Sequence, residues 1–107
     1  MTNMVQITTA APDKKTASLL AEQLVLNNVA ACVQIVPGIT SIYWWNDKIE
    51  ESQEFLCVIK TREDLYKKAE EIIKNNHPYD VPEITASKIT HISKEYHKWM
   101  LQYTTAG

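Results

Sequence analysis

Three histidines and two cysteines are the side chains of this sequence best suited to bind a transition metal, and they are scattered along the chain. Structural zinc motifs place Cys and His ligands in close local pairs, and no such pair occurs here. His77 directly precedes a proline at the end of a predicted helix, and we interpret it as a metal ligand or as a polar contact in a cleft between subunits. The alternative is that His77 interacts only with the helix dipole. The sequence therefore offers His77 as a candidate metal ligand without a complete site around it.

The other histidines and the cysteines favour structural interpretations. His91 lies at the end of a predicted strand, and His97 falls on the solvent side of a predicted helix. Cys32 and Cys57 both lie in apolar, strand-like segments. We interpret them as buried, reduced thiols, with a disulfide as the less favoured alternative.

A second group of side chains is polar and falls on or next to predicted strands. Its members are Glu54, Lys60, Tyr79 and Glu83. If copies of the chain associate, these side chains would converge with Trp44 or Trp45 of a neighbouring copy. The result would be a polar pocket at the subunit boundary, able to hold a small anion or a hydrated ion. The alternative, which we favour, is an interface ion pair of Lys60 with Glu54 or Glu83 that fixes the register of the assembly.

The sequence contains no recognisable catalytic motif. It has two glycines, Gly38 and Gly107, so it cannot form a glycine-rich phosphate loop, and it lacks both a nucleophile elbow and an H-E-x-x-H helix. Lys60, Glu83 and Tyr79 could in principle do acid–base work. We nevertheless predict that the protein is not an enzyme.

The composition and charge of the chain limit which partners it could bind and which cellular compartment we expect it to occupy. The chain has 107 residues and a net charge of −2, with no basic run, which argues against nucleic acid and anionic membrane surfaces as partners. No segment approaches the roughly 20 consecutive apolar residues of a membrane span. The N-terminal residues lack the pattern of a signal peptide. We expect one domain over residues 1–107 in the cytoplasm.

Residues 33–60 predict one long β-hairpin. Both arms are rich in β-branched and aromatic residues, and Asn46 and Asp47 between them tolerate the left-handed backbone of a type I′ turn. This turn pairs Trp44 with Ile49. Each arm spans about a dozen residues, roughly 40 Å, so part of the hairpin should project from a small domain. Its aromatic residues are interface anchors or, less favoured, a surface for stacking a ligand.

The segment before the hairpin predicts a strand followed by a helix. Residues 4–10 read as a short strand, and Pro12 with Asp13 opens a helix that stops at Asn27 and Asn28.

Within the hairpin, Gly38 follows a proline, which predicts a bulge or bend in the first arm.

The segment after the hairpin predicts a helix, a strand and a last helix. Thr61 and Asp64 match a capping box, and Pro78 ends that helix. Residues 83–92 read as a strand, and Ser93 caps the last helix. The order β-α-β-β-α-β-α predicts a ferredoxin-like α+β fold with an extra C-terminal helix and one open sheet face.

The run of residues 55–59, Phe-Leu-Cys-Val-Ile, is apolar at every position. Successive side chains of a strand point to opposite faces, so this run predicts that both faces of the sheet are buried. Two helices can cover only one face. We therefore predict self-association, with the open face packed on copies of itself and the hairpin reaching onto a neighbour.

An ordered set of short motifs, spanning nearly the whole chain, carries a family resemblance. The motifs are Ala11-Pro12-Asp13, Ala30-Ala31-Cys32-Val33, Ile35-Val36-Pro37-Gly38, Ser41-Ile42-Tyr43-Trp44-Trp45, Lys60-Thr61 and His77-Pro78-Tyr79-Asp80-Val81-Pro82-Glu83-Ile84. In this set the sequence resembles the CutA family of divalent-cation tolerance proteins. The resemblance implies a single CutA-like domain, a homotrimer similar to the PII signalling proteins, and a role in tolerance to heavy-metal ions, copper above all.

The resemblance also bears on metal binding. In copper-associated bacterial members a cysteine stands where this chain has Thr9, and a first histidine stands where it has Asn76. Only His77 remains of the three ligands that the resemblance implies, and imidazole and thiolate are the groups that copper prefers. We therefore expect weak copper(II) binding at most and no other cofactor.

The leading hypothesis is a cytosolic, trimeric CutA-like protein that acts in tolerance to divalent metal ions. One alternative is a PII-like sensor that binds a small anionic metabolite between subunits. The other is a small acid–base enzyme on the same trimeric scaffold.

Overall fold

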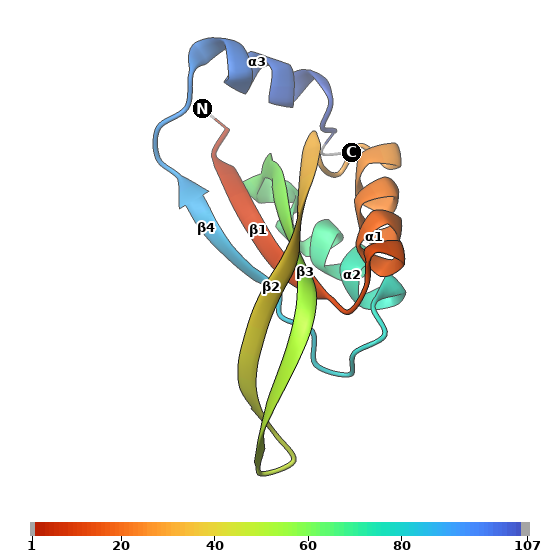
Figure 1. The fold of residues 1–107 in the computed structure, drawn as a ribbon. Helices are drawn as coiled ribbons and strands as arrows, with labels where there is room; N and C mark the ends of the chain where they lie inside the picture. Colours follow the sequence, from red (N-terminus) through yellow and green to blue (C-terminus); the bar gives the residue numbers. More distant parts are fainter. Residues whose placement is uncertain (1, 106–107) are drawn as a thin grey trace.

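The structure is a computed structural model, and it describes residues 2–105. It is an α+β fold in which one four-stranded antiparallel sheet carries helices α1 and α2 on one face, while α3 crosses one end of the sheet (Figure 1). The strands lie in the order β2-β3-β1-β4. In chain order the elements are β1 (Met4–Ala11), α1 (Lys14–Leu26), β2 (Cys32–Trp45), β3 (Lys48–Arg62), the 3-10 helix η1 (Glu63–Leu65), α2 (Tyr66–Asn76), β4 (Thr85–Ile89) and α3 (Lys94–Gln102).

The core lies between the sheet and the two helices that cover it. Ile7 of β1 pairs with Ile59 of β3, and both are fully buried against Leu20 and Leu24 of α1 and Ile73 of α2. Burial of one such aliphatic side chain contributes about 1.5–3 kcal/mol. This helix-covered face is therefore where the single chain gains most of its stability.

Helix α1 begins and ends where the sequence predicts. The carboxylate of Asp13 accepts a hydrogen bond from the Thr16 amide at 2.7 Å, which caps the helix and lowers the pKa of that carboxyl. At the other end Asn28 adopts the left-handed conformation with a φ of 57°, which stops the helix. Both local signals are confirmed.

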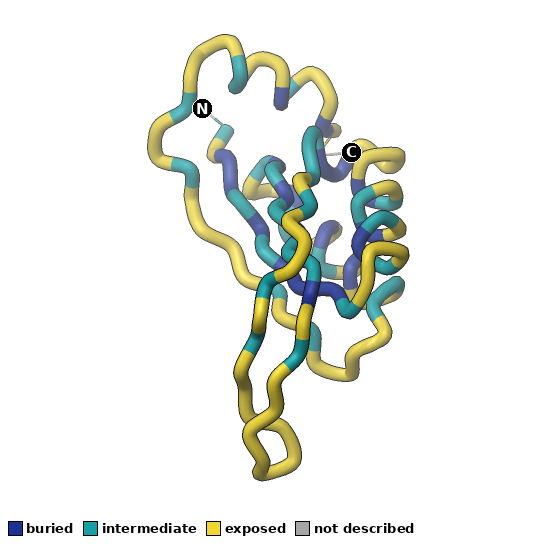
Figure 2. The backbone as a smooth tube through the Cα atoms, in the orientation of Figure 1, coloured by how far each residue is buried: buried dark blue, intermediate teal, exposed yellow. Residues whose placement is uncertain are grey.

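The long hairpin is confirmed in register and in turn. Trp44 pairs with Ile49, and the two turn residues Asn46 and Asp47 have φ values of 51° and 62°. The predicted irregularity lies between Val36 and Ile39, where Gly38 has a φ of 71°. The distal half of the hairpin projects beyond the other elements, and most of its residues are exposed (Figure 2).

The second face of the sheet, which we call the open face, is less completely covered. Leu56 and Val58 point to it, because they alternate with the fully buried Cys57 and Ile59 of the helix-covered face. Leu56 and Val58 are half-buried in the single chain. The chain itself therefore completes only one of the two buried faces that residues 55–59 predict.

The predicted cap at Thr61 is wrong. Strand β3 continues through Arg62, and α2 begins only at Tyr66, after the 3-10 turn η1. Thr61 is buried, and its hydroxyl donates a hydrogen bond to the carbonyl of Val29 instead of capping a helix. Arg62 forms the local ion pair with Asp64, at 2.9 Å.

The C-terminal elements differ from the prediction mainly in their bounds. Strand β4 is shorter than the predicted residues 83–92, so His91 lies beyond its end in an exposed segment. Ser93 caps α3 as predicted, accepting a hydrogen bond from the Tyr96 amide at 3.2 Å. His97 does not face solvent freely: it is half-buried, and its Nε2 lies 3.3 Å from the carbonyl oxygen of Thr2.

Candidate functional site

The structure brings together two of the predicted site residues, Glu54 and Tyr79. Glu54 lies on β3 at the root of the projecting hairpin, opposite Ile39 and directly after the bulge of β2. Tyr79 lies in the α2–β4 loop, which comprises residues 77–84. The Tyr79 hydroxyl donates a hydrogen bond to Oε2 of Glu54 at 2.9 Å. Glu54 is only 6% exposed, so this bond satisfies a carboxylate that is almost completely removed from water.

Burial of the phenol and the neighbouring carboxylate both raise the pKa of Tyr79, which reaches about 12. Burial is the larger cause, and the hydrogen bond and negative charge of Glu54 come next. Among the described residues Glu54 forms no ion pair. At neutral pH the pair is therefore a neutral phenol bound to a nearly buried group that has no cation beside it.

Lys60 and Glu83 do not join this pair within one chain. Lys60 lies further along β3, where it pairs with Cys32 of β2, and its ammonium is 5.8 Å from the centre of the Tyr96 ring. Glu83 is exposed on the α2–β4 loop. The single chain therefore assembles part of the predicted polar pocket, and Lys60 faces α3 instead.

His77 uses both ring nitrogens in hydrogen bonds. Its Nδ1 accepts a bond from the backbone amide of Tyr79 at 3.2 Å, and its Nε2 lies 2.8 Å from the carbonyl oxygen of Ala10 in β1. A carbonyl can only accept, so Nε2 carries the proton and donates it. The imidazole also packs on the Tyr79 ring, with 4.7 Å between the ring centres.

Thr9 and Asn76 are also engaged in the fold. Thr9 is fully buried opposite Cys57, and its hydroxyl has no hydrogen-bond partner among the described residues. The side-chain amide of Asn76 donates to the carbonyl of Ile72 at 2.8 Å, within α2. Burial raises the pKa of Cys57 to about 11, and both cysteines are free. Within residues 2–105 no three His, Cys, Asp or Glu side chains gather as a metal site would need.

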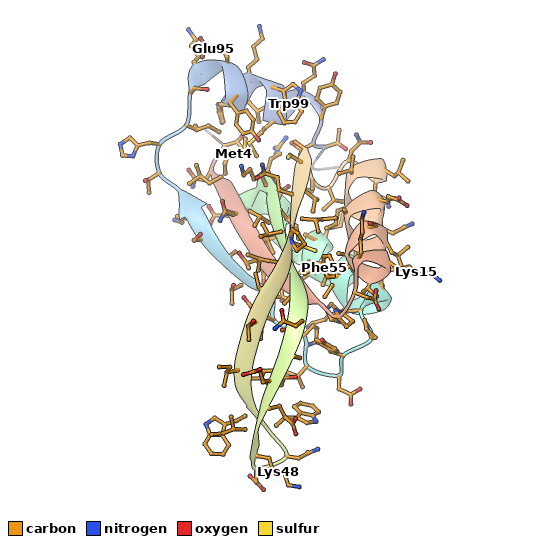
Figure 3. All side chains as sticks on the ribbon, viewed as in Figure 1. Met4, Lys15, Lys48, Phe55, Glu95 and Trp99 are labelled. Carbon is orange, nitrogen blue, oxygen red and sulfur yellow. The ribbon has the colours of Figure 1, made fainter. Side chains whose placement is uncertain are left out.

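The end of the hairpin carries a group of large exposed apolar side chains, which we call the hairpin tip. Its members are Ile42, Tyr43, Trp44, Trp45 and Ile49. Trp44 is 71% exposed and Ile49 is 64% exposed, and the two are directly paired across the strands. The side chains at this end of the hairpin lie near Lys48, far from Phe55, which packs against the core (Figure 3). The sequence prediction named the aromatic residues and missed Ile42 and Ile49, although the predicted register already placed Ile49 opposite Trp44.

Fold and site together define a small α+β protein with a projecting, apolar-tipped hairpin and a nearly buried carboxylate at its root. The family model for the CutA1 divalent ion tolerance protein matches residues 5–103. The chain therefore belongs to this family, and the family's description names ion tolerance rather than a reaction.

Several relatives support the assignment. The chain is 43% identical to the divalent-cation tolerance protein CutA of Thermus thermophilus, over 87% of this chain and 90% of the relative. It is equally similar, at 43% identity over 87% of its length, to the chloroplastic CutA 1 protein of rice, Oryza sativa subsp. japonica, but covers only 52% of that protein. The chain thus spans about half the length of its plant relative.

Solved structures agree with the fold. The crystal structure of CutA1 from Oryza sativa has a TM-score of 0.95 at 38% identity, covering 98% of this chain and 96% of the other. The structure of the Thermus thermophilus protein has a TM-score of 0.88 at 42% identity, covering 98% of this chain and 100% of the other. In the part of the chain that the structure describes, none of the helices is both long enough and apolar enough to span a membrane.

Proposed function

We propose that this protein acts in cytoplasmic tolerance to divalent heavy-metal ions and that its working unit is a homotrimer of ferredoxin-like subunits. Family membership supports the first part, and the sheet order β2-β3-β1-β4 supports the ferredoxin-like subunit. The observation that carries the trimer is the hairpin tip. Each of its five large side chains is at least 40% exposed in the single chain.

The tip resembles the centre of a protein interface more than an ordinary surface. Trp44 is 71% exposed, Ile42 is 67% exposed and Ile49 is 64% exposed, and these three share one face of the hairpin. Exposed clusters of large apolar residues mark interaction sites, and tryptophan is enriched among residues that dominate binding energy. A tip that docks on the open face of another copy makes a heterologous contact, and such contacts close into rings when the rotation allows.

Glu54 supplies a second argument for assembly. A carboxylate that is 6% exposed, with a single phenol as its hydrogen-bond donor, is costly to bury without a cation. In the proposed trimer, Lys60 of an adjacent copy provides that cation, and a hydrated divalent ion is the alternative occupant. Either one places charge compensation at the subunit boundary.

The two alternative functions receive less support from the geometry. A buried carboxylate repels an anion, so the surroundings of Glu54 do not favour an anionic metabolite. For acid–base catalysis the single chain brings only Tyr79 and Glu54 together, and it places Lys60 against Tyr96. The tolerance hypothesis requires neither an anion near Glu54 nor Lys60 beside Tyr79.

The test is growth in copper(II) and zinc(II) of cells that lack their own relative and express this chain. The tip variant Trp44→Thr/Ile49→Thr keeps strand-forming residues and removes the apolar surface. The matched control is Lys68→Gln, an exposed position on α2 away from the hairpin tip. We expect the wild type and the control to protect the cells and form trimers, and the tip variant to do neither. A monomeric tip variant that protects fully would contradict the trimer as the working unit, and a wild type that gives no protection would contradict the tolerance role.

A further inference from the structure

We propose that His77 holds no metal ion and is instead a positioning residue, which clamps the α2–β4 loop so that Tyr79 donates to Glu54. The inference goes beyond the proposed function, because it assigns a different role to the one candidate ligand in this chain. It rests on three observations: the state of the imidazole, the poor fit of the neighbouring groups, and the continuous set of contacts from β1 to β3.

The hydrogen-bond partners of the imidazole determine which of its ring nitrogens carries the proton. The backbone amide of Tyr79 can only donate, so Nδ1 of His77 uses its lone pair to accept that bond at 3.2 Å. The carbonyl of Ala10 can only accept, so Nε2 carries the proton at 2.8 Å. A metal ion needs a free nitrogen lone pair. Binding at either nitrogen would therefore break a hydrogen bond that fixes the loop.

The neighbouring groups do not fit a copper or zinc site. Thr9 is buried, and it offers a neutral hydroxyl where copper prefers a thiolate or an imidazole. Its cross-strand neighbour Cys57 is also buried and keeps its proton at neutral pH, whereas metals bind the thiolate. The Asn76 side chain is held by the Ile72 carbonyl within α2. Among the described residues His77 is therefore not part of any group of three His, Cys, Asp or Glu side chains that could hold a metal ion.

The same contacts show what His77 does in place of metal binding. One ring nitrogen ties the start of the loop to β1 at Ala10, and the other fixes the backbone of Tyr79. The rings of His77 and Tyr79 pack together at 4.7 Å, and the Tyr79 hydroxyl reaches Glu54 at 2.9 Å. This set of contacts, which we call the clamp, joins β1, the loop and β3 at the point where the hairpin leaves the core. Within one chain, these contacts hold the α2–β4 loop at the base of the hairpin through protein groups.

The first test is a titration of the folded protein with copper(II) chloride, followed by calorimetry and by 15N NMR of the histidine rings. We expect His77 to be neutral with its proton on Nε2, and its signals not to be the first to broaden as copper is added. The His77→Ala variant should bind copper as the wild type does, and His91→Ala, which removes an exposed histidine, is the matched control. Copper binding that broadens His77 first and is lost in His77→Ala, but not in His91→Ala, would overturn the inference.

The second test measures how the clamp affects the pKa of the Tyr79 phenol. In an alkaline titration monitored by tyrosine absorbance, the wild type should show a phenol that ionises near pH 12, and this phenol should be missing from Tyr79→Phe. In His77→Ala the late ionisation should move toward the ordinary range of about pH 10, because the loop no longer keeps the phenol buried and bonded to Glu54. In His77→Asn it should move less, since an asparagine side chain can bond the backbone amide two residues on.

An unchanged late ionisation in His77→Ala would show that Tyr79 needs no clamp, and would overturn the inference. His91→Ala should leave the ionisation unchanged. Assembly is measured separately, by sedimentation, so a failure of the clamp and a failure of the trimer are distinguishable.

Discussion

Strand β3 carries an isoleucine near each end, and the two have opposite surroundings. Ile59 has no exposed surface, while Ile49 is 64% exposed at the hairpin tip. Both have the same side chain on the same strand, so the difference comes from what covers them. Helices α1 and α2 cover the proximal half of the hairpin, and the distal half projects past them (Figure 1). The comparison teaches that the chain buries one half of its longest element and leaves the other half exposed.

The largest effect should come from truncating the two isoleucines separately. Ile59→Ala opens a cavity in the core and should cost about 2–5 kcal/mol of unfolding free energy, whatever the protein concentration. Ile49→Ala should cost little within a subunit and should weaken assembly, so its effect on the unfolding midpoint should depend on concentration. Urea unfolding of both variants at several protein concentrations measures the two losses of stability. Equal and concentration-independent losses would contradict the proposed difference between the two halves.

A smaller effect is expected at the boundary between the two halves, where Tyr79 meets Glu54. Tyr79→Phe removes the hydroxyl that serves a nearly buried carboxylate, and it should cost about 1–3 kcal/mol of unfolding free energy. The control is Tyr103→Phe, which removes a hydroxyl from an exposed tyrosine and should change little. Chemical denaturation of both variants provides the comparison. Equal changes in unfolding free energy in the two variants would show that the hydrogen bond to Glu54 adds no stability.

Two buried threonines should respond in opposite directions to the same substitution. Thr61 donates to the Val29 carbonyl, so Thr61→Val should cost about 1 kcal/mol or more. Thr9 has a buried hydroxyl without a partner among the described residues, so Thr9→Val should be neutral or stabilise the fold by up to about 1 kcal/mol. Thermal unfolding shows whether each variant is more or less stable than the wild type. A clear loss of stability in Thr9→Val would mean that its hydroxyl has a partner that the contacts do not reveal.

The smallest effect is expected at the turn of the hairpin. Asp47 has a φ of 62°, a conformation that glycine adopts without steric cost. Asp47→Gly should therefore raise the unfolding free energy by about 0.5 kcal/mol. Asp47→Ala, which keeps a Cβ and loses the polar side chain, should lower it. If the two variants have the same stability, backbone strain at the turn contributes nothing.

The local parts of this fold could be predicted from the sequence. The Asn46–Asp47 turn fixes the hairpin register, and Asp13 and Ser93 cap their helices, because these signals involve residues close together in the chain. Thr61 was predicted to cap a helix and does not. Its hydroxyl is satisfied by Val29, and a contact between segments so far apart overrides a local capping pattern.

The candidate site was predicted less completely, for the same reason. Glu54 and Tyr79 were both named in advance, but their hydrogen bond depends on how the α2–β4 loop folds back onto β3. The two partners of His77 are a carbonyl and an amide of the backbone, and one of them belongs to β1 at the opposite end of the sequence. Side-chain types cannot reveal backbone partners of this kind. The sequence therefore indicated which residues matter and left open what His77 does.

Sedimentation equilibrium of the wild-type protein at micromolar concentration tests the central claim most directly, since that claim is that other copies cover the hairpin tip and the open face. The account predicts the mass of three chains, each of 12.3 kDa, and a return to the mass of one chain in Trp44→Thr/Ile49→Thr. A wild-type protein that sediments as a single chain throughout that range would leave the tip facing water and would contradict the account.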